Sequence, residues 1–134
     1  MLRIQKVTVK AQRATLEALH TLTFPSDEQP QWDRDGLALL VYDAGEPVAF
    51  LYATEEEDGA WYFSRVGVMF SHRGQGLQRK LMRRMYKELK GRKLISTTYY
   101  NPTSANNFVR EQWLTWLPAK PWGCPDTIYW YKQL

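Results

Sequence analysis

The period of hydrophobic and polar positions changes several times along the chain, and each change marks an expected element. Alternating apolar and polar residues predict strands, whereas apolar residues three or four apart predict helices. Strand patterns occupy residues 2–10, 37–43, 47–54, 61–70, 94–100 and 127–132. Helical spacing occupies residues 12–22, 75–90 and 102–113. Proline-containing loops are expected at residues 25–35 and 118–125.

Several expected boundaries have signals of their own. Ala44 and Gly45 separate two apolar segments and predict a hairpin turn. Gly91 follows the second helix in the manner of a C-cap, and Pro102 suits the first turn of the third helix. Strands before, between and after helices predict an α/β protein, a mixed sheet with helices on its faces. Since no linker or repeat interrupts this order, we expect a single domain over residues 1–134.

Composition and charge limit the classes of function. The chain has 134 residues and a net charge of +4, which suits an anionic partner. Its single cysteine, Cys124, cannot form an internal disulfide and favours a reducing compartment, and with two histidines we expect no metal site. Apolar segments are too short to span a bilayer, so we expect a cytoplasmic protein with no membrane association.

Glycines mark the turn that leads from the strand 61–70 into the basic helix 75–90. Gly74 and Gly76 let the main chain bend tightly and approach a ligand. The helix N-terminus offers unpaired N–H groups and a partial positive charge, and Arg73 adds a permanent cation with forked donors. This turn is therefore predicted to bind phosphate.

The spacing of the turn excludes two common phosphate-binding motifs. A P-loop requires Gly-Lys-Ser/Thr, whereas Gly76 is followed by Leu77 and Gln78. A dinucleotide fingerprint requires a third glycine at the position of Arg79. In the preceding strand, Gly67 indicates a bulge or a close approach by a backbone or a ligand.

The segment Arg73-Gly74-Gln75-Gly76-Leu77-Gln78 resembles motif A of the GNAT superfamily of N-acetyltransferases, which reads Gln/Arg-x-x-Gly-x-Gly/Ala. Arg73 and Gly76 match this motif, whereas Gln78 occupies its last, small position and leaves slightly less room there. Val66-Gly67-Val68 is similar to the splayed strand of the family. Asn101-Pro102-Thr103-Ser104 is similar to the opening of its later helix. The resemblance implies a GNAT-like fold with a mostly antiparallel sheet, a splayed strand pair and flanking helices.

The resemblance also implies that acetyl-CoA is the co-substrate. Main-chain groups of Val66 and Val68 would pair with the pantetheine amides as an added strand does. Asn101 would bond the pantetheine arm, or would cap its own helix instead. The pyrophosphate would lie beside Arg73, on main-chain N–H groups of Gly74, Gln75, Gly76, Leu77, Gln78 and Arg79.

The implied reaction is N-acetyl transfer, in which a neutral primary amine attacks the thioester directly in a ternary complex. A strand N–H near Val66 would stabilise the oxyanion. The family often places a tyrosine acid seven residues after the asparagine, and that position is Phe108 here. Tyr99, Tyr100 or Tyr131 would then serve as the acid, or the thiolate would leave unaided.

The base and the acceptor are left open by the sequence. Glu55, Asp58 and a relayed water are the candidates for the base. Arg65 suggests an anionic group on the acceptor. Further residues that could line the acceptor cleft are Phe24, Trp32, Tyr62 and Tyr99.

Two other functions compete with catalysis. Phe108 favours a GNAT-like module that binds acyl-CoA without turnover. The basic helix 75–90 is open to three readings, which are a solvated face, attraction of the 3′-phosphate by Arg79, Lys80 or Arg83, and binding of nucleic acid. We regard nucleic acid as the less expected partner beside acetyl-CoA and an unidentified amine. A homodimer through the C-terminal aromatic strand remains an open alternative.

Overall fold

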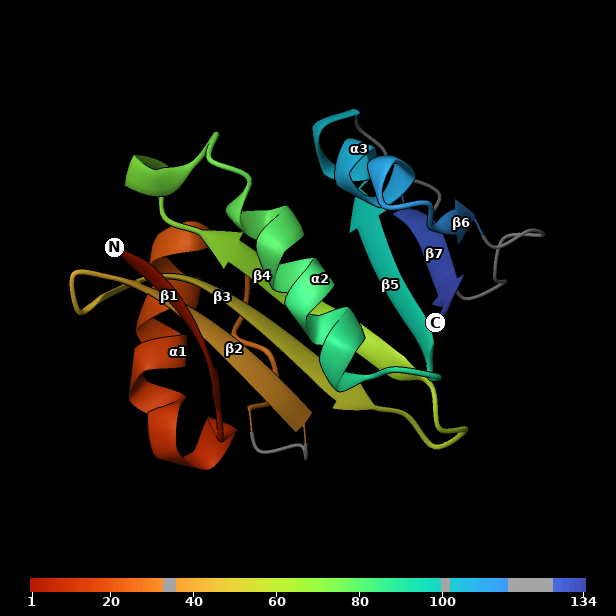
Figure 1. Ribbon diagram of the computed structural model, residues 1–134, viewed down its shortest axis with the longest axis horizontal. Coiled ribbons are helices and arrows are strands. Elements are labelled where there is room, and N and C mark those ends of the chain that lie inside the picture. Colours follow the sequence, from red (N-terminus) through yellow and green to blue (C-terminus); the bar gives the residue numbers. More distant parts are fainter. Residues whose placement is uncertain (33–35, 100–101, 116–126) are drawn as a thin grey trace.

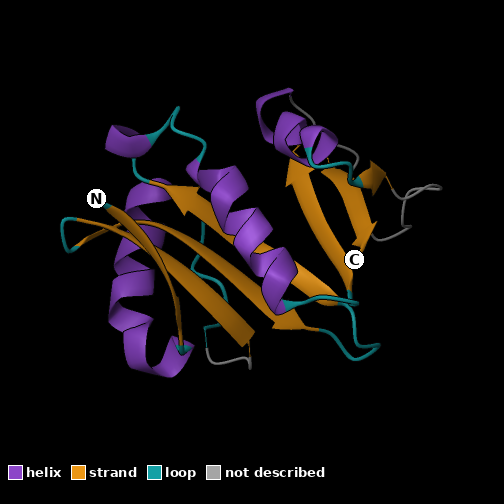
Figure 2. Ribbon diagram, in the orientation of Figure 1, coloured by secondary structure: helices purple, strands orange, loops and turns teal. Residues whose placement is uncertain are grey.

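A computed structural model describes residues 1–32, 36–99, 102–115 and 127–134 (Figure 1). Its elements in chain order are β1 Leu2–Val7, α1 Val9–Thr23, β2 Gly36–Asp43, β3 Glu46–Glu55, β4 Trp61–Val68, a 3₁₀ helix Phe70–His72, α2 Leu77–Glu88, β5 Lys93–Tyr99, α3 Pro102–Arg110, β6 Leu114–Thr115 and β7 Thr127–Gln133. Helix α1 covers one face of the sheet, and α2 lies across the other (Figures 1 and 2). No helix within these ranges is long and apolar enough to cross a membrane.

The sheet consists of two antiparallel parts joined by one parallel contact. Its strand order is β1-β2-β3-β4-β5-β7-β6. Strands β1 to β4 pair antiparallel, as do β5, β7 and β6. The parallel contact joins β4 to β5 through three residue pairs, Trp61–Leu94, Tyr62–Ile95 and Phe63–Ser96, after which the strands diverge (Figure 1). The predicted mixed, mostly antiparallel sheet with a splayed strand pair is confirmed.

The central strands are buried on both faces because a helix layer covers each side. Alternate residues of β2 and β3 enter opposite layers, as strand geometry requires. Leu39 and Leu51 pack with Leu81 of α2, whereas Leu40 and Phe50 lie in the layer formed with α1. The near-continuous apolar pattern of β3 therefore reflects two cores rather than one.

Two helix boundaries differ from the sequence prediction. Thr8 caps α1, since its hydroxyl accepts a hydrogen bond from the Ala11 N–H at 3.3 Å, so that residues 9–10 belong to the helix rather than to the first strand. Helix α3 ends at Arg110 because Gln112 adopts a φ of 64° and the Trp113 N–H bonds back to the Phe108 carbonyl. This end was not predictable, because the residue in the left-handed conformation is not glycine. The predicted loop at 118–125, with Cys124, lies outside the described residues.

The bulge in β4 lies at Ser64 and not at Gly67. Tyr52 of β3 pairs with Arg65 and the next residue pairs with Phe63, so that Ser64 has no opposite residue. Gly67 is required by close packing instead: a Cβ there would lie 2.6 Å from the Thr23 hydroxyl and 2.5 Å from the Phe50 ring. The close approach expected at this glycine therefore comes from α1 and β3.

Candidate active site

The divergence of β4 and β5 opens a cavity of about 970 Å³ in the middle of the molecule. Its lining includes the part of β4 beyond Phe63, the turn before α2, the start of α2, and residues of β5 and α3. At the point of divergence the Ser96 hydroxyl donates to the Phe63 carbonyl at 2.9 Å. This contact joins the two strands at the last of their paired residues.

The free edge of β4 directs alternate main-chain groups into this gap. The Met69 N–H donates to the Val48 carbonyl of β3 at 2.8 Å, whereas the Val68 carbonyl points the other way and accepts from Arg73 Nε at 3.1 Å. Because alternate residues of a strand face opposite neighbours, Val66 has the same direction as Val68. The main-chain N–H and C=O of Val66 therefore face the gap, as an added strand would require.

The turn between β4 and α2 has the conformation that its glycines predicted. Gly74 and Gly76 have φ values of +80° and +74°, and a Cβ at either would meet no atom within 4 Å. Gly76 precedes the first residue of α2, and no side chain caps the helix. The first N–H groups of α2 are therefore available to an anion, with Arg73, Leu77 and Gln78 among the cavity-lining residues.

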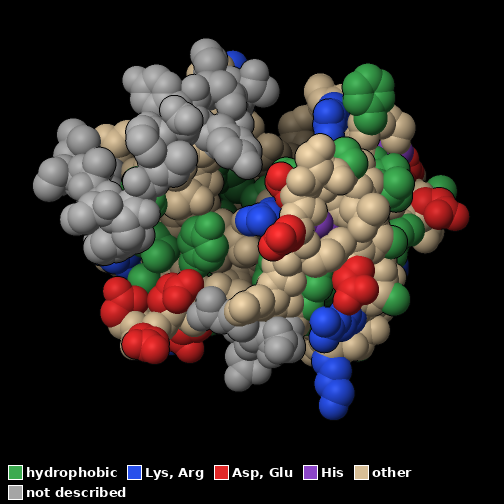
Figure 3. All heavy atoms as spheres, turned by 180° about the vertical axis from the view of Figure 1, so that it is seen from behind, with side chains coloured by type: hydrophobic (Ala, Val, Ile, Leu, Met, Phe, Trp, Pro, Cys, Tyr) green, Lys and Arg blue, Asp and Glu red, His purple; other side chains and the backbone are tan. Residues whose placement is uncertain are grey.

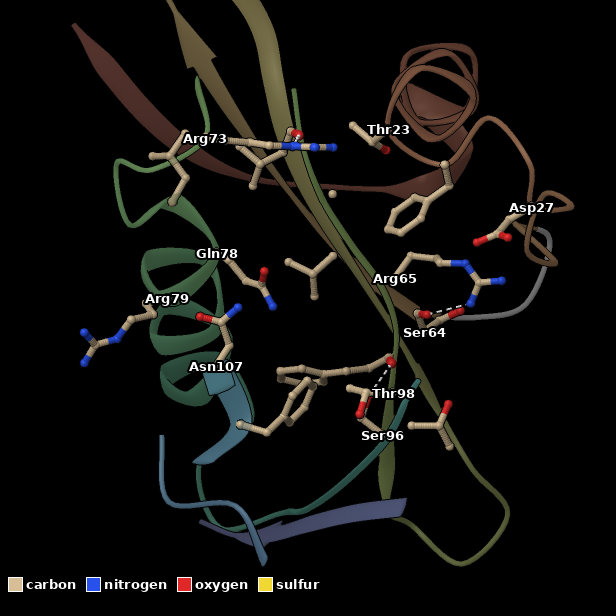
Figure 4. Close-up of a pocket in the computed structure, with 18 of the residues that line it drawn as sticks. Thr23, Asp27, Ser64, Arg65, Arg73, Gln78, Arg79, Ser96, Thr98 and Asn107 are labelled. Atoms are coloured by element: carbon tan, nitrogen blue, oxygen red, sulfur yellow. Dashed lines mark hydrogen bonds between the residues drawn. The ribbon is translucent and has the colours of Figure 1, made fainter. Parts of the chain in front are cut away.

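The side chain of Arg79 is directed away from the cavity (Figure 4). Arg79 Nε donates to the Glu111 carboxylate at 3.3 Å, and Arg83 donates to the same carboxylate through Nε and Nη2 at 3.4 and 3.3 Å. Glu111 is buried and follows α3, so this ion pair ties α2 to the end of α3. Arg79 can therefore serve the predicted cofactor site through its main chain, while its guanidinium is already bound.

On the opposite side of β4, Arg65 faces the end of α1 (Figure 4). Its Nε donates to His20 Nε2 at 3.2 Å, and its Nη1 donates to the Ser64 carbonyl at 2.8 Å. Burial, and secondarily the Arg65 charge, lower the pKa of His20, so the imidazole is neutral near pH 7 and can accept this bond. The other ring nitrogen, Nδ1, is buried with no partner among the described residues.

Phe108 forms part of the cavity wall and of an aromatic cluster. Its ring stacks on Trp130 with centroids 5.4 Å apart and meets Trp113 edge-on at 4.9 Å. The half-buried phenol of Tyr86 accepts a hydrogen bond from Trp113 Nε1 at 2.8 Å, and loss of solvation raises the pKa of this phenol well above the usual range. Tyr86 is outside the cavity lining, so it does not replace the missing tyrosine acid.

The candidate catalytic residues from the sequence are not brought together. Glu55 ends β3 beside Trp61, at the paired end of β4, and its carboxylate lies 3.9 Å from Arg92 Nη1. It does not line the cavity, and neither does Asp58, whose side chain accepts from the Ala60 N–H. Tyr99 is the last residue of β5, but its side chain is not described. Tyr100 and Asn101 lie outside the described residues.

Some of the residues predicted to line the acceptor cleft do line the cavity, and others do not. Phe24 and Arg65 do line the cavity, whereas Trp32 is buried beneath α1 and Tyr62 points to Thr97, with the two hydroxyls 3.2 Å apart. Further polar residues that line the cavity were not predicted, and they include Asp27, Glu28, Ser64, Ser96, Thr98 and Asn107. The sequence carries no distinct signal for these residues, since Ser96 lies in a strand with several other polar residues and Asp27 and Glu28 lie in an exposed loop.

A parallel strand pair that opens beside an uncapped, glycine-led helix is the arrangement expected from the resemblance to the acetyltransferases. The model of the acetyltransferase (GNAT) family matches residues 7–112, and the chain belongs to this family. The recognition made from the motif residues is thus confirmed. No curated protein matches the sequence.

Solved structures share the fold at low sequence identity. An IAA acetyltransferase from Bacillus cereus is 18% identical with a TM-score of 0.79, and the match covers all of both chains. A GNAT acetyltransferase from Elizabethkingia anophelis with acetyl-CoA bound is 17% identical with a TM-score of 0.79, covering 99% of this chain and 98% of that one. A PaiA N-acetyltransferase from Thermoplasma acidophilum in complex with coenzyme A is 9% identical with a TM-score of 0.74, covering 100% and 99%.

Proposed function

We propose that this protein is an N-acetyltransferase that transfers an acetyl group from acetyl-CoA to a primary amine by direct attack in a ternary complex. The observation that carries the proposal is the open edge of β4 beside the glycine turn of α2. A ligand with two amide groups and a diphosphate matches these two features in order along the cavity. Structural neighbours that hold acetyl-CoA and coenzyme A support the choice of co-substrate.

The residues of the cavity fit such a ligand. Val66 offers a main-chain N–H and C=O that face the gap, and these would pair with the pantetheine amides. The amides from Gly74 to Arg79 would hold the diphosphate, helped by the positive end of α2. Glycines at 74 and 76 keep the space in front of these amides open, since no side chain projects from them.

Within this site the bound thioester supplies the acetyl group, and the protein orients the amine toward it. Orientation alone contributes up to roughly 7–11 kcal/mol to catalysis in favourable cases. A main-chain N–H of the free β4 edge near Val66 would stabilise the developing oxyanion. No tyrosine hydroxyl lines the cavity among the described residues, so we propose that the thiolate leaves without a tyrosine acid at position 108.

Binding is tested by the variant Gly76→Asp. For the wild type, acetyl-CoA at a hundredfold excess over its Kd stabilises the fold by about 2.7 kcal/mol, a shift of several degrees in Tm. We expect Gly76→Asp to abolish this shift, because a carboxylate would face the diphosphate. Thermal unfolding with and without acetyl-CoA measures both proteins.

The matched control is Gly91→Asp, in the connection from α2 to β5. Gly91 has a φ of +83° and open space around its Cβ position, so it carries the same backbone strain at the far end of the helix. The control should keep the full shift with acetyl-CoA. An equal shift in Gly76→Asp and the wild type would show that the diphosphate lies elsewhere.

A second function, binding of acyl-CoA without turnover, is favoured by Phe108 alone. The two functions are separated by incubating the protein with acetyl-CoA and a panel of amines and measuring the released thiol. Transfer to any amine above the rate of hydrolysis supports the enzyme. A cofactor-dependent Tm shift without transfer to any amine supports the silent module.

A further inference from the structure

The cavity has a second charged side, which the cofactor does not account for. The glycine turn and Arg73 lie toward α2, whereas Arg65 projects from β4 toward the end of α1 (Figure 4). Asp27 and Glu28, in the loop that follows α1, line the cavity together with Arg65. In the view from behind, cationic and anionic side chains meet at a hollow in the surface (Figure 3).

The Arg65 guanidinium is held in place without a direct ion pair among the described residues. Two of its five N–H donors are used, by His20 Nε2 and by the Ser64 carbonyl, and both acceptors are uncharged. No carboxylate of the described residues lies within ion-pair distance of it, although Asp27 and Glu28 share its cavity. A fixed fork with three donors left over matches a carboxylate.

Two carboxylates share the cavity with Arg65 and favour a positively charged group on the ligand whose carboxylate Arg65 would bind. Asp27 and Glu28 are exposed at the rim, where they attract an ammonium group before it reaches the gap between β4 and β5. An acceptor with a single positive charge would suit Asp27 and Glu28 but would leave the three remaining N–H donors of Arg65 without an acidic partner. An acceptor that carries one amine and one acid satisfies both signs.

We propose that the acceptor is an amino acid, whose carboxylate binds the Arg65 guanidinium while its amine is acetylated. This inference rests on the proposed function. His20 acts as a positioning residue, since it fixes the guanidinium through Nε. Its burial and its contact with Phe24, at a ring separation of 5.1 Å, hold the imidazole still.

The test crosses protein variants with acceptor pairs. Glycine, leucine, phenylalanine and glutamate are each compared with the corresponding C-terminal amide, which keeps the amine but lacks the α-carboxylate. In the wild type we expect kcat/KM to be higher for the acid by roughly 10- to 100-fold, the range for a hydrogen bond to a charged group. Arg65→Gln should remove this preference by weakening the acids and sparing the amides.

Arg84→Gln, on α2 and outside the cavity, is the control and should keep the wild-type preference. Equal rates for acid and amide in the wild type would overturn the proposal and leave N-acetyl transfer standing. A uniform loss for acids and amides in Arg65→Gln would also overturn it, because Arg65 would then only hold the bulge against α1.

The role of His20 has its own pair of variants. Gln places a carbonyl oxygen near the position of Nε2, whereas Leu provides no acceptor for Arg65. We expect His20→Leu to raise KM for the acids without the same change for the amides. His20→Gln should have a KM for the acids close to that of the wild type. Parallel changes in both acceptor classes, or no rescue by Gln, would overturn the positioning role.

A binding readout separates this proposal from the proposed function. If no acceptor is acetylated, the Tm of the protein saturated with coenzyme A is measured with each acid and amide. Stabilisation by an acid, absent with its amide and absent in Arg65→Gln, supports the acidic ligand even though transfer has failed. No stabilisation by any acid in that case overturns it.

Discussion

Single residues in this protein carry two different kinds of backbone constraint. Gly74 and Gly76 are needed for their positive φ, which depends on the local turn. Gly67 is needed because α1 and β3 leave no room for a side chain. The first constraint serves a ligand site and the second serves the packing of β4.

Gly67→Ala should therefore destabilise the fold. Its Cβ would lie within 2.6 Å of the Thr23 hydroxyl and 2.5 Å of the Phe50 ring, and overpacking of this kind costs about 1–3 kcal/mol. Urea denaturation measures the loss. Adding Thr23→Ala should recover part of it, because one of the two obstacles is removed. A Gly67→Ala protein as stable as the wild type would contradict the packing role.

At the residue scale, some features of the site could be predicted from the sequence and others could not. The turn at Gly74 and Gly76 was predictable because its signal is local. The clash that fixes Gly67 was not, since Thr23 and Phe50 are distant in the chain. Asp27 and Glu28 likewise reached the cavity only through the course of the loop after α1. The predicted base, Glu55, failed to reach it because the gap opens at the other end of β4.

Among elements, the contact between α2 and α3 depends on a buried carboxylate. Glu111 accepts from Arg79 and Arg83 of α2, and its carbonyl accepts from Lys132 Nζ of β7 at 2.8 Å. One acidic side chain thus compensates two cations of the basic helix. The solvated-face reading of that helix is correspondingly incomplete, because two of its arginines are tied to the molecule.

Glu111→Gln should loosen this contact. Breaking a fully buried ion pair typically costs about 3–5 kcal/mol. Here the two arginine side chains are 39% and 61% exposed, so we expect about 1–2 kcal/mol in urea denaturation. Glu17→Gln, which breaks an exposed pair with Arg13, should cost less than about 0.5 kcal/mol. Equal losses in the two variants would contradict the importance of burial.

Helices and strands were predicted well where the pattern of apolar and polar residues extends over many positions. The hairpin of β2 and β3, helix α2 and strand β7 lie close to their expected positions. Boundaries that depend on a cap or a distant contact were less accurate, as the start of α1 at Thr8 and the end of α3 at Gln112 show. Strand β6 was not predicted because two residues carry no period.

At the scale of the whole molecule, stability should depend on pH through His20. Burial lowers the pKa of His20 in the folded protein, whereas the unfolded chain binds a proton near the ordinary value of about 6.5. The unfolded state thus binds more protons below that pH, so stability falls as pH decreases from about 6.5 toward the folded pKa. Above it both states are neutral and His20 contributes no slope.

Urea denaturation at pH 7.5 and pH 5.5 measures this dependence, with a slope of at most about 1.4 kcal/mol per pH unit for one proton. His20→Gln should be flatter over the same interval, since Gln does not titrate. Asp43, whose pKa is lowered by its hydrogen bond to His72, acts in a separate window below about 3.8. Identical slopes for the wild type and His20→Gln would exclude His20 as the source.

The arrangement of the whole sheet was predictable only in part. Element order and motif residues together indicated the splayed pair, and the structure confirms it. The bulge at Ser64 could not be foreseen, because it depends on the register between β3 and β4. Self-association through the C-terminal strand remains a prediction, because the structure contains a single chain.

Three residue pairs join the two antiparallel parts of the sheet, which meet along a short seam rather than a full ladder. A pantetheine arm paired with β4 would extend this short contact as an added strand does. The bound ligand would then help to hold the two parts of the sheet together. The protein without ligand should then be the more flexible form. Release of coenzyme A would require the contacts between the pantetheine arm and β4 to break again. If the proposed transfer takes place, release of coenzyme A would contribute to the turnover rate together with the chemistry at the thioester.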